Sequence, residues 1–139
     1  LQLAQAYSVF ANGGYLKDFR LFIDNLDDIY QQRVISKDTA DDVLDSLKLV
    51  VSDGTGSLAK ISNFEVAGKT GTSHKSSLKG GYDQSKYIAS FVGIAPLKTK
   101  RLTIFVNIDE PGLNNYSGGD VAAPLFAAIS DDVLNYLNE

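Results

Sequence analysis

Residues 66–73, with the sequence VAGKTGTS, combine two glycines, a lysine and two threonines in one short segment. Gly68-Lys69-Thr70 could close a phosphate-binding loop, or Lys69-Thr70-Gly71 could lie on a strand that holds an anionic ligand. A phosphate-binding loop needs a glycine five residues before Gly68, where this chain has Asn63. Such a loop also continues into a helix, whereas here a glycine and a β-branched Thr72 follow the lysine. The strand is therefore the favoured reading.

A strand at this point brings together several groups that bind anions. Its period of two places Thr70 and Thr72 on one face and Lys69 and Gly71 on the other. The two hydroxyls can donate to a carboxylate, the lysine adds a positive charge, and the glycine permits close approach. The Thr72 N–H could also supply half of an oxyanion hole. The alternative is that a lysine and two threonines simply decorate an exposed strand.

Composition limits the other classes of function. With 139 residues, the chain is long enough for one domain with a hydrophobic core. Its 13 basic and 17 acidic residues argue against a nucleic-acid partner. It has no cysteine and only one histidine, His74, so we expect no metal site and no cofactor. The acidic run Asp24–Asp28 lacks the central glycine and terminal glutamate of a calcium loop and is expected to be a solvated turn.

Apolar residues at helical spacing predict three helices. The first lies within residues 1–14, the second follows a Ser36 cap and ends at Asp53-Gly54, and the last has Asp120 as a candidate cap and Pro124 near its first turn. The apolar residues expected on one face are Leu3, Ala6, Tyr7 and Phe10 in the first helix, Ala40, Val43, Leu44, Leu47, Val50 and Val51 in the second, and Phe126, Ile129, Val133 and Leu137 in the last.

Three antiparallel strands are expected between the second and last helices. Residues 64–72, 87–95 and 102–108 are rich in β-branched and aromatic side chains. Pro96 marks a turn between the last two of these segments, and residues 73–85, rich in Lys, Gly and Ser, read as a mobile hairpin loop. The fold class is therefore α+β, an antiparallel sheet with flanking N- and C-terminal helices.

Five segments, in order along nearly the whole chain, resemble the C-terminal part of the transpeptidase domain of class B penicillin-binding proteins, the septal cell-division type in particular. These segments are YSVFANGG (residues 7–14), VVSDGTG (50–56), VAGKTGTS (66–73), FVGIAP (91–96) and YSGGDVAAPLF (116–126). Two departures are visible in the last segment: Ser117 stands where a second aromatic residue is common, and Asp120 where a small or apolar residue is usual.

The resemblance implies that residues 1–139 are a single, incomplete domain, the C-terminal portion of a serine β-lactamase/transpeptidase-like fold. The parent protein would cross-link peptidoglycan stem peptides through a serine acyl-enzyme, and β-lactams would acylate the same serine. Lys69 would belong to the active-site proton and electrostatic network. Thr70 and Thr72 would hold the substrate carboxylate, Gly71 would bind substrate beside them by allowing close approach, and the Thr72 amide would lie at the oxyanion. The parent would work at the periplasmic face of the bacterial inner membrane, with its anchor upstream and cell-division proteins as candidate partners.

The family's nucleophilic serine has no convincing counterpart here. Its Ser-x-x-Lys motif matches at Ser57–Lys60 and at Ser76–Lys79, and no Ser-x-Asn occurs. A nucleophile needs a fixed helix-start geometry, and neither match has room for a long helix. We therefore expect the nucleophile upstream and the isolated chain to be inactive.

Other interpretations are weighed beside this one. His74 next to Ser73 resembles a serine–histidine pair, but neighbours on a strand face opposite ways, so His74 is expected to be a loop residue. The block from Lys60 to Arg101 is net positive and either attracts an anion or consists of solvated lysines. A noncatalytic β-lactam- or peptide-binding module and a nucleotide-binding fragment are the alternative functions.

Overall fold

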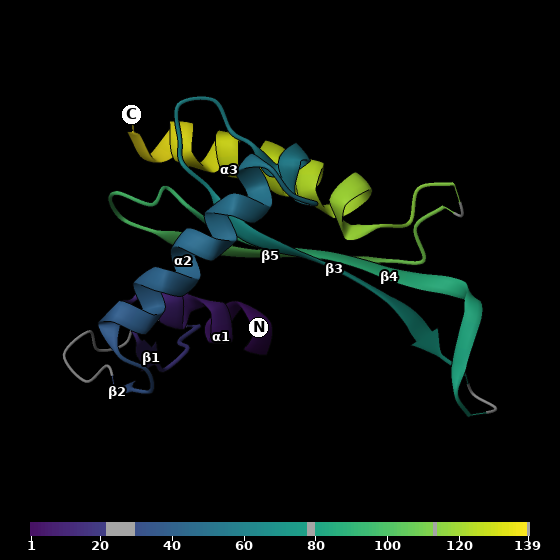
Figure 1. Cartoon of the computed structure of the whole chain (residues 1–139), viewed down its shortest axis with the longest axis horizontal. Coiled ribbons are helices and arrows are strands. Elements are labelled where there is room, and N and C mark those ends of the chain that lie inside the picture. The colour runs from purple at the N-terminus through teal and green to yellow at the C-terminus, as the bar shows by residue number, and fades with distance from the viewer. Residues whose placement is uncertain (22–29, 78–79, 113, 139) are drawn as a thin grey trace.

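The computed structural model describes residues 1–21, 30–77, 80–112 and 114–138, and the expectation for Asp24–Asp28 lies outside these residues. Figure 1 shows a sheet with helices on both sides and a long hairpin that projects beyond them. The elements are α1 (Gln2–Ala11), β1 (Tyr15–Lys17), β2 (Gln31–Arg33), α2 (Lys37–Ser52), η1 (Ser57–Ala59), β3 (Ala67–Ser76), β4 (Tyr82–Ala95), β5 (Leu102–Asp109), η2 (Gly118–Ala122) and α3 (Ala123–Asn138).

The central sheet is antiparallel, in the order β3-β4-β5. Its register places Thr70 opposite Phe91, and Phe91 opposite Val106. The expected α+β class with three antiparallel strands is confirmed. Residues 69–72 lie on β3, which is an edge strand of this sheet.

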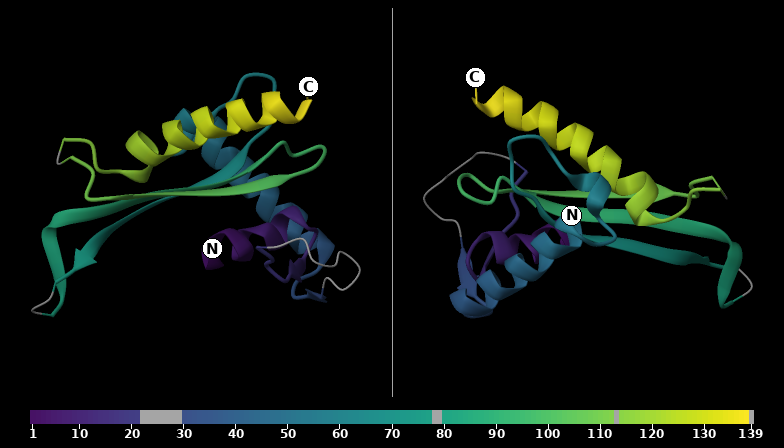
Figure 2. Two further views of the ribbon diagram at one scale, coloured as in Figure 1. Left: turned by 180° about the vertical axis from the view of Figure 1, so that it is seen from behind. Right: turned by 45° about the horizontal axis from the view of Figure 1, so that its top comes forward.

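Alternate residues of β4 pack against different helices, because successive side chains of a strand point to opposite faces. Phe91 is fully buried and its ring centroid lies 5.0 Å from that of Phe126 on α3. Ile94 belongs to a second cluster with Leu44 and Leu47 of α2. The sheet is therefore covered by α3 on one face and by α1 and α2 on the other, as the two views of Figure 2 show.

The second helix follows its sequence prediction closely. Ser36 is the N-cap, and its hydroxyl accepts a 3.0 Å hydrogen bond from the Thr39 amide. The helix ends with Asp53 as C-cap, and the buried residues of the predicted stripe are Ala40, Leu44, Leu47 and Val51. Capping and apolar periodicity are local signals, so the sequence alone sufficed here.

The Ser36 cap gives a first testable prediction. Changing Ser36 to Ala should lower the free energy of unfolding by about 1 kcal/mol, because the amides of the first turn of α2 lose an acceptor. Ser36→Asp should retain most of the stability, since a carboxylate also accepts from these amides. Chemical denaturation of the two variants would check this, and equal losses in both would contradict the capping role.

Two expectations about the hairpin and its first strand are wrong, and one small sheet was not expected. Residues 73–85 are not a loop throughout, because β3 continues to Ser76 and β4 begins at Tyr82. The strand expected from residue 64 begins only at Ala67. The small sheet formed by β1 and β2 was not predicted, since three-residue strands are too short to show a period of two.

The buried face of α3 also differs from its prediction. Phe126 is buried, but Ile129 and Leu137 are exposed at 39% and 54%, and the face against the sheet contains Ser130 and Leu134 instead. The i, i+4 spacing of Phe126, Ser130 and Leu134 defines this face. Because a serine lies at the centre of this face, a prediction based on apolar residues alone did not identify it.

The predicted N-cap of the last helical segment is also wrong. Ser117, not Asp120, is the N-cap of the short π-helical turn η2. The extended backbone of Ser117 lets its hydroxyl accept from the Asp120 amide. In α1, Tyr7 and Phe10 are half-buried as expected, but Leu3 is exposed and Val9 is the buried residue.

Candidate functional site

Lys69, Thr70, Gly71 and Thr72 are extended on β3, as the strand reading predicted. In the described part of the chain, β3 pairs with β4 alone, so its other edge can offer backbone groups to a ligand. Lys69 and Thr72 are exposed, and Thr70 and Gly71 are half-buried. A strand at this position argues against the phosphate-binding loop, which would place a helix after the lysine.

Thr70 is held by contacts from two sides. Its hydroxyl oxygen lies 2.9 Å from the Thr55 hydroxyl, which comes from the turn after α2. Lys69 Nζ donates to the Thr70 carbonyl oxygen at 3.0 Å and lies 3.5 Å from the Thr70 hydroxyl oxygen. The positive charge of Lys69 therefore sits beside a hydroxyl that can bind an anion.

Thr72 is held by the start of η2. The Gly118 amide donates a 3.0 Å hydrogen bond to Thr72 Oγ1. Since this hydroxyl oxygen already accepts a hydrogen bond, its own proton is left to point toward another acceptor. The contact thus leaves the Thr72 hydroxyl able to act as a hydrogen-bond donor.

This contact depends on a close approach of backbone to backbone. A Cβ atom on Gly118 would lie 2.2 Å from the Ser90 carbonyl oxygen and 2.4 Å from the Gly71 carbonyl oxygen. Gly71 and Ser90 are themselves paired across β3 and β4. η2 can reach Thr72 only because residue 118 has no side chain.

The two residues that depart from the family pattern are partners of each other. Ser117 Oγ donates to Asp120 Oδ2 at 2.7 Å, and the Asp120 amide donates to Ser117 Oγ at 3.1 Å. Together they close the first turn of η2, in the manner of a capping box. The fine geometry of this loop is therefore maintained by a local polar pair.

Three aromatic rings form a row from β3 across β4 to the segment before η2. The His74 ring lies 4.5 Å from that of Tyr87, and the Tyr87 ring stacks at 4.1 Å on Tyr116, just before η2. His74 Nδ1 is buried, with no hydrogen-bond partner among the described residues. The expectation that His74 is a loop residue is wrong, because β3 extends past it.

The two serines of the Ser-x-x-Lys matches lack the geometry of a nucleophile. Ser57 begins η1, a 3-10 helix of three residues, and Ser76 is the last residue of β3. Lys79 lies outside the described residues. The expectation that neither serine starts a long helix is confirmed.

Several lysines of the positive block are paired with carboxylates. Lys75 contacts Asp109 and Glu110, and Lys86 contacts Glu110. These hydrogen bonds raise the pKa of Lys75, through Asp109 first and Glu110 second, and lower the pKa of Glu110, through Lys75 first and Lys86 second. Lys98 lies 3.7 Å from Glu65, whose pKa is lowered mainly by Lys48. Lys75 and Lys86 are therefore paired rather than free cations, whereas Lys98, at 85% exposure, fits the prediction of a solvated lysine.

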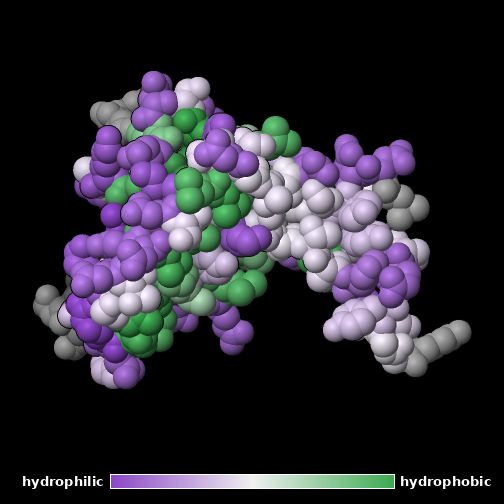
Figure 3. Space-filling view, in the orientation of Figure 1, coloured by the Kyte–Doolittle hydropathy of each residue, from purple (hydrophilic) through white to green (hydrophobic). Residues whose placement is uncertain are grey.

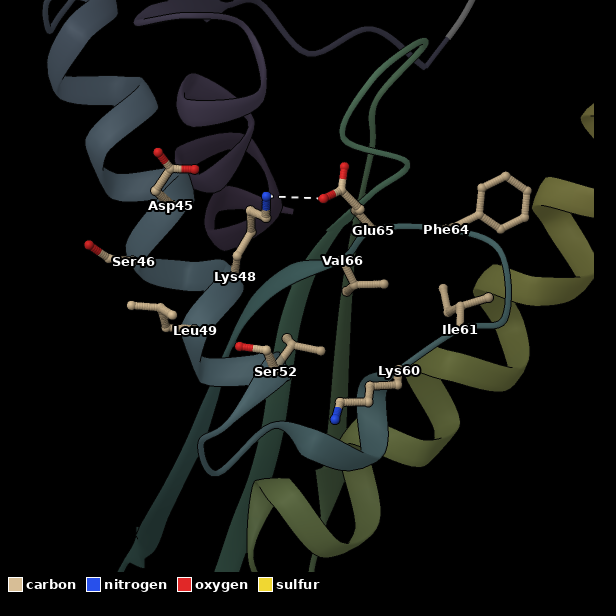
Figure 4. A pocket seen from close by; sticks show the side chains of 11 residues that line it. Asp45, Ser46, Lys48, Leu49, Ser52, Lys60, Ile61, Phe64, Glu65 and Val66 are labelled. Atoms are coloured by element: carbon tan, nitrogen blue, oxygen red, sulfur yellow. Dashed lines mark ion pairs between the residues drawn. The ribbon is translucent and has the colours of Figure 1, made fainter.

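The surface around the motif is open. Figure 3 shows the hairpin as an arm beside the helical body, with a hollow between the two. A separate apolar cavity of about 650 Å³ lies between α2 and the segment before β3, and Figure 4 shows Leu49, Ile61 and Phe64 around it with the Lys48–Glu65 ion pair at its rim. Its lining includes no residue of the 69–72 segment, so this cavity is distinct from the motif.

The described residues contain no cluster of three or more acidic, histidine or cysteine side chains that could hold a metal ion. Within the same residues, no helix is both long and apolar enough to cross a membrane.

Four residues that contact the motif or its aromatic extension are not among the site residues predicted from the sequence. They are Thr55, Tyr87, Tyr116 and Gly118. Tyr87 and Tyr116 stand at the ends of segments noted for strand character and for family resemblance. These segments could therefore be linked to the site from the sequence, but the sequence did not show which of their side chains contact the motif or its aromatic neighbours.

Comparison with known proteins gives a consistent result. The family described as "Penicillin binding protein transpeptidase domain" matches residues 1–131. The chain is 35% identical over 143 aligned residues to the peptidoglycan D,D-transpeptidase FtsI of Buchnera aphidicola, covering 99% of this chain and 25% of that protein. It is 38% identical to the probable peptidoglycan D,D-transpeptidase PenA of Neisseria flavescens, covering 99% and 34%. The chain thus spans a quarter to a third of the length of these relatives.

Solved structures agree with the sequence matches. The apo transpeptidase domain of penicillin-binding protein 3 from Burkholderia pseudomallei superposes with a TM-score of 0.87 at 41% identity, covering 99% of this chain and 42% of that one. Penicillin-binding protein 3 of Mycobacterium tuberculosis in complex with ampicillin superposes with a TM-score of 0.81 at 28% identity, covering 99% and 34%.

Proposed function

Because this chain belongs to the family of penicillin-binding protein transpeptidase domains, we propose that residues 1–139 are the C-terminal part of the catalytic domain of a division-type peptidoglycan D,D-transpeptidase. One observation carries the proposal beyond family membership. Lys69, Thr70 and Thr72 lie together on an open strand edge, with Gly118 holding the Thr72 oxygen as an acceptor. The arrangement is suited to a peptide that ends in a carboxylate.

The proposed reaction is an acyl transfer in two steps. A serine oxygen attacks the carbonyl carbon between the last two D-alanines of a stem peptide, the C–N bond breaks, and the terminal D-alanine leaves with a proton on its amine. An amine of a neighbouring stem then attacks the resulting ester, the C–O bond breaks, and the serine regains its proton. A β-lactam enters the first step when the amide bond of its ring opens.

Each residue of the motif has a proposed role in this scheme. Thr70 and Thr72 donate hydrogen bonds to the carboxylate of the substrate or drug, and Gly71 leaves room for the peptide to lie against β3. The Thr72 amide supports the oxyanion that forms during attack. Lys69 supplies the positive charge that favours both negative groups.

The nucleophilic serine is proposed to lie outside these 139 residues. Neither Ser57 nor Ser76 begins a helix that could fix it beside a base, and the matched relatives are three to four times as long as this chain. The upstream half of the same domain is therefore the first partner of the chain. Its elements would close the open side of β3.

The proposed location follows from the substrate. Peptidoglycan is assembled outside the inner membrane, so the enzyme would act at the periplasmic face, held by an anchor upstream of this segment. Its ligands would be stem peptides and β-lactams, and ampicillin is bound in one of the matched structures. Cell-division proteins are its proposed protein partners.

Intact mass after exposure to a penicillin tests the proposal. We expect no covalent adduct on the 139-residue chain, and one penicilloyl adduct on the protein that includes the upstream half. Peptide mapping should place that adduct upstream of this segment. An adduct on Ser57 or Ser76 would overturn the assignment. A longer protein that is acylated but never turns over a stem peptide would instead be a β-lactam-binding module.

A further inference from the structure

A carboxylate just after β5 joins both sides of the β3–β4 hairpin. Glu110 Oε1 lies 2.8 Å from Lys75 Nζ on β3 and 3.1 Å from Lys86 Nζ on β4. Lys75 also contacts Asp109, at 2.9 Å. The Glu110 backbone has a φ of 52°, an uncommon left-handed conformation for a residue with a side chain. We call Lys75, Lys86 and Glu110 the hairpin clamp.

The clamp lies where the hairpin is irregular. His74 pairs with Tyr87, but the next residue, Lys75, pairs with Asp83, so the register leaves residues 84–86 of β4 without partners on β3. Bulges of this kind bend a strand pair, and Figures 1 and 2 show the hairpin turning away from the sheet at this end. An ion pair at this point can fix the direction of the hairpin, which the interrupted hydrogen-bond ladder leaves undetermined.

The clamp connects to the motif through Tyr87. The Glu110 amide donates to the Tyr87 carbonyl oxygen at 3.0 Å, and the Tyr87 ring stacks on Tyr116. Two residues after Tyr116, the Gly118 amide donates to Thr72 Oγ1. The connection from β5 to η2 is thus anchored at its start by Glu110 and at its end by Tyr116 and Gly118.

We propose that Glu110 is a positioning residue for carboxylate binding. Lys75 and Lys86 hold the Glu110 side chain, and Glu110 in turn keeps the Tyr87 ring stacked on Tyr116. The Gly118 amide then stays bonded to the Thr72 hydroxyl oxygen, and the Thr72 hydroxyl proton points toward the ligand. This inference rests on the proposed function, because it concerns the affinity of the same strand for an anionic ligand.

Electrostatics agrees with this geometry. The three side chains of the clamp are between 27% and 47% exposed, so the contacts are partly screened and should weaken as salt is added. The two lysines lower the pKa of Glu110, with Lys75 the larger cause, so Glu110 is charged throughout the neutral range. Its folded pKa is depressed, so the clamp should weaken only as the pH falls below the usual carboxyl range.

The test compares two ligands on the protein that includes the upstream half. The second-order acylation rate is measured with a penicillin and with its methyl ester, which lacks the carboxylate charge. Glu110→Gln should slow acylation by the penicillin about fivefold, a modest coupling between contacting groups, and leave acylation by the ester unchanged. The loss should shrink at high salt, because screening weakens the intact clamp.

Matched lysine variants sharpen the test. Lys75→Ala should reproduce the loss, whereas Lys75→Arg, which keeps the charge, should stay close to wild type. Lys48→Ala breaks an ion pair of similar exposure, Lys48–Glu65 at 3.1 Å, which joins α2 to the segment before β3, and it should change neither ligand's rate. Equal losses with both ligands, or no loss in Glu110→Gln, would overturn the positioning role. A wild-type protein that no penicillin acylates would refute the proposed function itself.

Discussion

Changing Lys69 to Ala should reduce acylation of the protein that includes the upstream half by about 100- to 1000-fold, the range found when one donor to a developing oxyanion is removed. The Lys69 ammonium group lies against the Thr70 carbonyl and hydroxyl oxygens, beside the hydroxyls proposed to hold the ligand carboxylate. Alanine removes this charge without disturbing the core, because Lys69 is exposed. The acylation rate with a fluorescent penicillin would measure the loss.

Two further variants separate charge from position. Lys69→Arg keeps the charge but replaces a compact ammonium by a planar fork, so we expect only partial activity. Lys98→Ala removes a lysine that is 85% exposed in the turn before β5, and it should leave the acylation rate unchanged. Acylation of Lys69→Ala at the wild-type rate would show that β3 is only a scaffold.

The sequence predicted those parts of the fold that depend on local signals. The Ser36 cap and the apolar stripe of α2 are both read within one helix, and the three strands appear as β-branched runs. The hairpin was misread because its Lys, Gly and Ser residues have low strand propensity. Pairing with the opposite strand nevertheless carries β3 to Ser76.

For the site, the motif itself was predictable and its surroundings were not. Lys69 to Thr72 could be placed on a strand from their own alternation. Thr55 and Gly118, however, reach this strand from 15 and 46 residues away. Such contacts are set by how α2 and η2 pack on the sheet, and no local pattern encodes them. The glycine-rich stretch before α3 was visible, but its reason became clear only from the backbone atoms that it touches.

That close contact gives the second large prediction, for Gly118→Ala. The added Cβ would lie 2.2 Å from Ser90 O and 2.4 Å from Gly71 O, closer than real Cβ atoms come to backbone. β3 and β4 are paired at these two residues, so η2 must move instead. We expect a loss of about 1–3 kcal/mol in the free energy of unfolding, as for other overpacked sites.

The same displacement should impair acylation, because the Gly118 amide leaves Thr72 and the hydroxyl proton is no longer directed toward the ligand. We expect at least a tenfold fall in the acylation rate, because a donor that is displaced should cost less than the roughly 100- to 1000-fold loss found when a donor is removed. Gly112→Ala is the matched control. It lies in the connection that leads to η2, and a Cβ there would meet no atom within 4 Å, so both stability and acylation should remain at wild-type values. If Gly118→Ala behaved like this control in both measurements, the close packing of η2 on β3 would be contradicted. The proposed role of the Thr72 hydroxyl as a donor would then be abandoned.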